Sequence, residues 1–142
     1  MTAVVVVDAC VANKWFLPEP DAQLAKQFLS PGFRLVGPDF VLVEVANAIW
    51  KNRRLKRIGD DAATAALAVI RRYFDQLLPS EELVVEAYDF ARAVDHPVYN
   101  CLYLAAARRS SAKLVTTDSV LLRKLASRPE ATLAVALADW RP

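Results

Sequence analysis

The sequence has few of the residues from which several common kinds of active site are built. It contains one histidine, His96, two cysteines and three glycines. A single histidine excludes histidine-rich zinc sites and leaves one candidate base for a serine or cysteine nucleophile. The glycines form neither a Walker loop nor a dinucleotide-binding fingerprint, so we expect no nucleotide cofactor. Two cysteines, Cys10 and Cys101, are too few for a disulfide framework, and we expect free, inert thiols.

Long apolar runs and excess charge are also missing. Although hydrophobic residues make up 55% of the 142 residues, no run approaches the roughly 18 consecutive apolar residues that a membrane span requires. The opening Met1-Thr2-Ala3 lacks the basic region of a secretory signal. These features predict a cytoplasmic protein without membrane contact, folded as one domain over residues 1–142. The net charge of +2 is too small to indicate nucleic-acid binding by itself.

The pattern of apolar residues predicts alternating strands and helices. Four consecutive valines, Val4 to Val7, run directly into Asp8, as is typical of a central parallel strand buried on both faces. Further strands are predicted over residues 34–36, 113–117 and 131–137, with a short one within 75–78. Helices are predicted from an Asp39 cap to about residue 57, over 60–74, from a Ser80 cap to about residue 94, and over 99–110 and 119–127. This alternation predicts a three-layer α/β/α sandwich with a mainly parallel central sheet of four or five strands.

Three carboxylates stand out as candidate site residues. Asp8 and Asp118 each follow a predicted strand, and ligand sites of parallel sheets lie beyond the carboxyl ends of the strands. Each aspartate also precedes a helix, so a purely structural role as a helix cap remains the alternative. Glu44 lies in an apolar helix with Asn47 one turn on, and a buried carboxylate needs a partner. That partner is either a bound cation or a buried arginine or lysine.

Four segments, taken in order, resemble the motifs of PIN-domain ribonucleases, specifically the VapC-type toxins of bacterial toxin–antitoxin pairs. They are residues 6–19, 38–50, 96–105 and 114–118, and together they span essentially the whole chain. Glu44 and Asn47 occupy matching places in the second motif. One departure concerns the third motif, where the family carries an aspartate after the tyrosine and this sequence has Asn100.

The resemblance implies a site for Mg²⁺ or Mn²⁺, which favour oxygen ligands. Asp8 and Asp118 are then the main ligands, and Glu44 binds through water or orients the nucleophile. Asn100 takes the fourth position, and because its amide is uncharged we expect weaker Mg²⁺ binding than an aspartate would give. The resemblance places three further side chains behind these groups: Asn47, Thr116 and Thr117. Asp95 and His96, where the third motif begins, either join the site from the loop or form an ordinary turn and helix start, and we expect the second.

Basic residues are clustered at the end of the Glu44 helix. Lys51, Arg53, Arg54 and Arg57 could bind RNA phosphates, with Lys56 among them. The alternative is a solvated helix end whose positive charges complement the helix dipole. Lys14 follows the Asp8 turn and is either a phosphate contact or an exposed lysine.

The function that these patterns favour is a metal-dependent endoribonuclease, the toxin of a toxin–antitoxin pair. The resemblance further implies a homodimer and an antitoxin segment lying across the active-site groove. The alternative is a PIN domain weakened by Asn100, or an engineered inactive form, that binds RNA or antitoxin without efficient cleavage. A small-molecule phosphoryl-transfer enzyme is less favoured, because no phosphate-binding loop is present.

Overall fold

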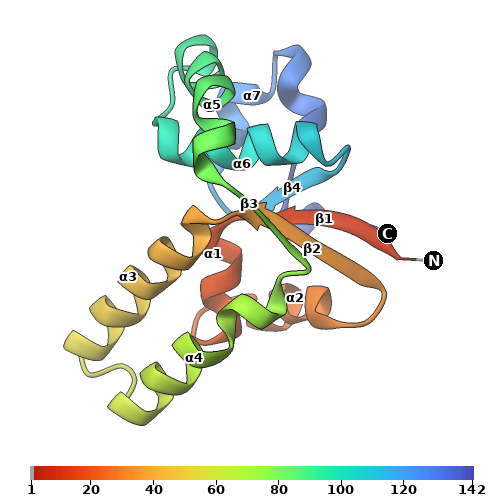
Figure 1. The fold of residues 1–142 in the computed structure, drawn as a ribbon. Coiled ribbons are helices and arrows are strands. Elements are labelled where there is room, and N and C mark those ends of the chain that lie inside the picture. Colours follow the sequence, from red (N-terminus) through yellow and green to blue (C-terminus); the bar gives the residue numbers. More distant parts are fainter. Residues whose placement is uncertain (1) are drawn as a thin grey trace.

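The centre of the fold is a five-stranded sheet whose strands all run parallel (Figure 1). The computed structural model describes residues 2–142. The strand order is β3-β2-β1-β4-β5, which confirms the predicted mainly parallel sheet. The strands are β1 (Ala3–Val7), β2 (Phe33–Pro38), β3 (Gln76–Leu78), β4 (Lys113–Thr116) and β5 (Ala134–Ala136).

Helices cover both faces of the sheet, giving the three layers that the sequence predicts. Figure 1 shows α5, α6 and α7 on one side of the sheet and α1 to α4 on the other. The helices are α1 (Ala9–Ala12), α2 (Ala22–Lys26), α3 (Phe40–Arg54), α4 (Asp60–Tyr73), α5 (Ser80–Val94), α6 (Val98–Arg109) and α7 (Ser119–Leu125). Within residues 2–142, no helix is long and apolar enough to cross a bilayer.

Two elements are buried on all sides and hold the core together. In β1, Val5, Val6 and Val7 are fully buried, because β2 and β4 pair with its two edges and helices cover its faces. In α6, every residue from Cys101 to Ala107 is buried. Small alanines on α6 let the helix lie close to the sheet, while Leu104 and Tyr103 fill the remaining space.

Several predicted boundaries differ from the structure. The last strand covers only Ala134–Ala136, because the preceding residues Pro129–Leu133 form a 3-10 helix in which Pro129 occupies the first turn. Helix α3 ends at Arg54, since Lys56 takes a positive φ of 59° that a helix cannot continue. The short α1 and α2 were not predicted, because elements of four or five residues carry too little periodicity.

The two predicted helix caps are also wrong in detail. Asp39 precedes α3 with helical backbone angles and forms no cap bond. Its Oδ1 instead accepts hydrogen bonds from the backbone N–H of Ser80, at 3.1 Å, and from the Ser80 hydroxyl. Ser80 is itself not a cap residue: it is the first residue of α5, and Pro79 is in the cap position. The aspartate joins the ends of β2 and β3 instead of serving its own helix.

We predict that Leu104→Ala destabilises the protein by about 2–5 kcal/mol, the usual cost of a cavity in a tightly packed core. The leucine side chain is fully buried in α6. Urea unfolding followed by circular dichroism measures the change. Val43→Ala on α3 is the control, because Val43 is 60% exposed and its loss should change stability by no more than about 0.5 kcal/mol. Equal effects of the two substitutions would contradict the packing described.

Candidate active site

A cleft of about 290 Å³ opens where β1 and β4 end, at the carboxyl edge of the sheet. It brings together the three carboxylates singled out in the sequence. Asp8 follows β1, Asp118 lies two residues beyond β4, and Glu44 comes from the first half of α3. The remaining lining residues are Ala9, Cys10, Asn100, Tyr103 and Thr117.

Asp8 both caps α1 and lines the cleft. Its Oδ1 accepts hydrogen bonds from the backbone N–H of Val11, at 3.2 Å, and from the thiol of Cys10, at 2.7 Å. Its Oδ2 accepts one from the hydroxyl of Thr116. Burial raises the pKa of Asp8 above its ordinary value, and the charge of Asp118 adds to this rise, while these three hydrogen bonds lower it.

Asp118 is likewise fixed at both carboxylate oxygens. Its Oδ1 accepts the N–H of Leu121 at 3.0 Å and caps α7, and its Oδ2 lies 3.0 Å from Nε2 of His96. The backbone N–H of Asp118 donates to the hydroxyl oxygen of Thr116 at 3.0 Å. His96 thus differs from the expected ordinary turn residue: it is buried behind Asp118, and Asn100 lies 3.2 Å from the same nitrogen.

Glu44 has a partner that the sequence analysis missed. The hydroxyl of Tyr103 donates a hydrogen bond to Glu44 Oε1 at 2.5 Å. Glu44 forms no ion pair within residues 2–142, so neither an arginine nor a lysine is its partner there. Burial raises the pKa of Glu44, and the Tyr103 hydrogen bond lowers it. A tyrosine inside the apolar run of α6 was the available signal, because a buried hydroxyl needs a partner as much as a buried carboxylate does.

Not every predicted site residue reaches the cleft. Asn47 is exposed on α3 and does not line it. Thr116 is fully buried beneath it, and Thr117 lines it. Lys14 uses its Nζ to donate to the carbonyl oxygen of Pro20 at 2.8 Å. Cys10 lines the cleft as a protonated thiol, because burial and the Asp8 charge raise its pKa to about 12.

The predicted basic cluster forms a separate surface at the end of the α3–α4 hairpin. Lys51, Arg53, Arg54 and Arg57 are all exposed, and none of them lines the carboxylate cleft. Arg53 donates to Asp60 at 2.5 Å, which offsets part of the positive charge. In Figure 1 this hairpin projects away from the sheet.

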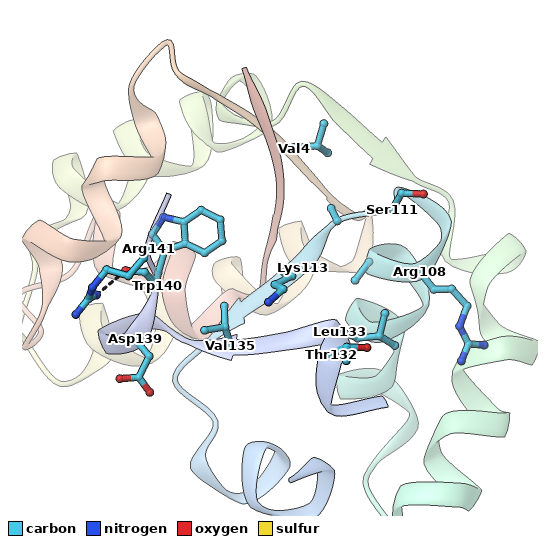
Figure 2. Close-up of a pocket in the computed structure, with 12 residues that line it drawn as sticks. Val4, Arg108, Ser111, Lys113, Thr132, Leu133, Val135, Asp139, Trp140 and Arg141 are labelled. Carbon is cyan, nitrogen blue, oxygen red and sulfur yellow. Dashed lines mark hydrogen bonds between the residues drawn. The ribbon is translucent and has the colours of Figure 1, made fainter. Parts of the chain in front are cut away.

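A cleft of about 700 Å³ lies where β1 and β4 begin, at the opposite end of these strands from the carboxylates. Figure 2 shows Val4, Lys113, Val135 and Trp140 among its lining residues. It contains only one acid, Asp139, and the guanidinium of Arg141 donates to backbone carbonyls beside it. The chemistry expected of a carboxylate site therefore belongs to the smaller cleft.

The donor set of the smaller cleft suits a hard divalent cation. Asp8, Glu44 and Asp118 present carboxylate oxygens, which Mg²⁺ and Mn²⁺ prefer. The raised pKa values of Asp8 and Glu44 reflect negative charge that burial leaves poorly solvated. Within residues 2–142, however, no three histidine, cysteine, aspartate or glutamate side chains are close enough together to form a ready-made metal site. The groups fit a cation that keeps several water ligands better than one enclosed by protein.

Comparisons with known proteins show the family of this chain. The family model described as "PIN domain" matches residues 5–127. Ribonuclease VapC3 of Pyrobaculum aerophilum is 31% identical over 121 residues, which cover 84% of this chain and 92% of VapC3.

Two solved structures share the fold. The crystal structure of PAE2754 from Pyrobaculum aerophilum has a TM-score of 0.69 at 23% identity and covers 97% of this chain and 93% of its own. A toxin–antitoxin complex from Klebsiella pneumoniae contains a chain with a TM-score of 0.60 at 13% identity, covering 94% of this chain and 97% of its own.

The chain therefore belongs to the PIN-domain family. Within that family it is of the VapC type, in agreement with the four sequence motifs.

We predict that Asp8→Asn stabilises the metal-free protein at pH 7, raising its melting temperature by several degrees. Because the pKa of Asp8 is raised on folding, the folded protein holds this proton more tightly than the unfolded chain does. The contribution of this proton to the stability of the parent protein is therefore lost as the pH rises from the pKa of Asp8 in the unfolded chain through its pKa in the folded protein. The advantage of the variant should shrink as pH falls towards 4.

Thermal unfolding in EDTA across pH 4–8 measures this difference. Asp89→Asn on the exposed side of α5 is the control, since Asp89 lies away from the cleft. A melting temperature of Asp8→Asn below that of the parent at pH 7 would show that the hydrogen bonds of Asp8 outweigh its desolvation.

Proposed function

We propose that this protein is a metal-dependent endoribonuclease that hydrolyses RNA phosphodiester bonds as the toxin of a toxin–antitoxin pair. The observation that carries the proposal is the meeting of Asp8, Glu44 and Asp118 in one cleft at the carboxyl edge of the sheet. Membership of the PIN-domain family and the likeness to ribonuclease VapC3 support it.

In this proposal Asp8 and Asp118 hold Mg²⁺ or Mn²⁺. The chemistry that a bound divalent cation supplies is the activation of water and the stabilisation of negative charge on the phosphate. Thr116 fixes both aspartates, because its hydroxyl donates to Asp8 Oδ2 and accepts from the Asp118 N–H. Glu44, held by Tyr103 at 2.5 Å, orients the attacking water. Thr117 lines the cleft beside Asp118 and is available to hydrogen-bond a phosphate.

The basic cluster at the end of α3 is proposed to bind the RNA backbone away from the reacting phosphate. Five exposed cations gather there, Lys51, Arg53, Arg54, Lys56 and Arg57, and phosphate contacts supply much of the affinity for nucleic acids. Lys14 is a weaker candidate, since RNA would have to compete with its hydrogen bond to Pro20. Asn47 is exposed on the same helix and contributes at most through water.

The proposal includes two protein partners, an antitoxin and a second copy of this chain. The fold is shared with a chain of a toxin–antitoxin complex, which supports an antitoxin as binding partner. The homodimer is also retained, because α5 exposes apolar side chains suited to an interface, among them Val85 and Tyr88.

The alternative is a weakened PIN domain that binds RNA or antitoxin without efficient cleavage. Asn100 favours it, because this uncharged amide lines the cleft where the family carries a fourth carboxylate. Cleavage rates and RNA affinity distinguish the two functions, since only the first requires turnover.

We predict that the purified protein cleaves single-stranded RNA with Mg²⁺ or Mn²⁺ and not in EDTA. Asp8→Ala and Asp118→Ala should each lower the rate at least about 100-fold, because each removes a charged group on which transition-state stabilisation depends. Calorimetry should show that the heat of Mn²⁺ binding is largely gone in both variants. The control is Asp89→Ala, which removes an exposed carboxylate outside the cleft. Metal-dependent binding without any cleavage by the parent would favour the weakened form, and unchanged Mn²⁺ binding in both variants would refute the metal site.

We also predict that replacing Arg53, Arg54 and Arg57 by glutamine weakens RNA binding and flattens its salt dependence. Each lost phosphate contact should reduce the slope of log K against log salt by about 0.7 for single strands. Fluorescence anisotropy with a labelled RNA at several KCl concentrations measures the slope. Replacing Arg34, Lys113 and Arg141, three exposed cations outside the α3–α4 hairpin, is the control for net charge. Equal slopes in the two triple variants would leave the hairpin cluster as a solvated helix end.

A further inference from the structure

The imidazole of His96 lies between two polar side chains of the cleft. Its Nε2 is 3.0 Å from Oδ2 of Asp118 and 3.2 Å from Nδ2 of Asn100. The ring is buried, and its other nitrogen, Nδ1, has no hydrogen-bond partner in the described part of the chain. A single ring nitrogen therefore contacts two side chains, and in each contact a donor has to face an acceptor.

The carboxylate determines which nitrogen of His96 carries a proton. Asp118 already accepts the N–H of Leu121 at Oδ1, and its Oδ2, which faces the ring, is suited to accept a hydrogen bond as well. An unprotonated Nε2 would direct a lone pair at this carboxylate and would leave an Nδ1–H donor buried without an acceptor. Neutral imidazole with Nε2–H avoids both costs, and imidazolium also carries Nε2–H. In either form Nε2 donates.

This assignment fixes the orientation of Asn100. A protonated Nε2 has no lone pair to accept a hydrogen bond, so Nδ2 at 3.2 Å would set one donor against another. The amide therefore has to turn so that its oxygen faces Nε2. The two ends of an asparagine amide have nearly the same shape, and they are assigned from the hydrogen-bond network. The NH₂ group then takes the other end of the amide, for which residues 2–142 offer no hydrogen-bond partner and which opens on the cleft that Asn100 lines.

We propose that His96 orients Asn100 so that its NH₂ group donates a hydrogen bond to a phosphate oxygen of the bound RNA, and that Asn100 is not a ligand of the cation. An amide NH₂ repels a cation and attracts an anionic oxygen, so the residue at this position serves the substrate and not the metal. His96 is then a positioning residue. This inference rests on the proposed ribonuclease function for its substrate, but the orientation of the two side chains does not.

The orientation is tested first, without RNA or metal. Because His96 is the only histidine of the sequence, ¹⁵N–¹H correlation spectra of the tag-free, ¹⁵N-labelled protein report one imidazole. We expect the pattern of an Nε2–H tautomer or of imidazolium at pH 7. The pattern of an Nδ1–H tautomer would overturn the inference and would leave the proposed ribonuclease function unaffected.

The role of Asn100 is tested by separating RNA affinity from metal affinity. Anisotropy at saturating Ca²⁺, which also takes oxygen ligands, measures binding of a fluorescein-labelled 12-nucleotide RNA of mixed sequence, whose integrity is checked on a gel. Mn²⁺ electron paramagnetic resonance measures binding of the metal alone. For Asn100→Ala we expect RNA affinity to fall by about tenfold, the loss of one hydrogen bond to a charged group. Mn²⁺ affinity should change less than about twofold. The opposite result, weaker Mn²⁺ binding with unchanged RNA affinity, would make Asn100 a metal ligand and overturn the inference.

Gln76→Ala is the matched control, since it removes an exposed amide at the start of β3, outside the cleft. It should change neither affinity.

The positioning role of His96 is tested by two variants. His96→Gln keeps an N–H donor that can face Asp118 and Asn100, whereas His96→Leu fills the space without a donor. We expect the RNA affinity of His96→Leu to fall about as far as that of Asn100→Ala, and His96→Gln to restore most of it. Equal losses in the leucine and glutamine variants would show that the ring only fills space. If His96→Leu fails to fold, the spectrum of the parent protein and the Asn100→Ala affinities still decide the question.

Discussion

The cleft depends on the two hydrogen bonds made by the hydroxyl of Thr116. It donates to Oδ2 of Asp8 and accepts the backbone N–H of Asp118, so one buried group joins the ends of β1 and β4. Burial keeps this hydroxyl away from water, which would otherwise compete for both bonds. The parallel pairing of β1 with β4 places the two strand ends side by side, and Thr116 then holds the two aspartates at a fixed separation. The arrangement explains why two acids 110 positions apart in the sequence line one cleft.

Glu44 and Asp118 are each held by a further buried side chain. Tyr103 donates to Glu44, and His96 lies against Asp118. These contacts orient the carboxylates, but no lysine or arginine neutralises them within the described residues. The cleft therefore carries a negative charge that the protein itself does not balance. A site of this kind gains more from a divalent cation than one that is already paired with basic residues.

The sequence was sufficient for the sheet and for the three acids, because both follow from strong local signals. The valine run of β1 and the long periodic helices α3, α5 and α6 are close to their predicted bounds. The predictions that failed concern contacts between distant segments of the chain. The Asp39 carboxylate bonds to Ser80 across 41 positions, and the Tyr103 hydroxyl reaches Glu44 across 59. No local pattern distinguishes such a partner from solvent, whereas the need of a buried acid for some partner was already evident.

Helix α3 carries Glu44 near the cleft and the first arginines of the basic cluster at its other end. Ten residues separate Glu44 from Arg54, which corresponds to about 15 Å of helix. An α-helix of this length is stiff, so the distance between the two groups stays nearly constant. Under the proposed function, an RNA shorter than this span contacts only one of them. The length of the helix would then set the shortest RNA that can contact both groups at once.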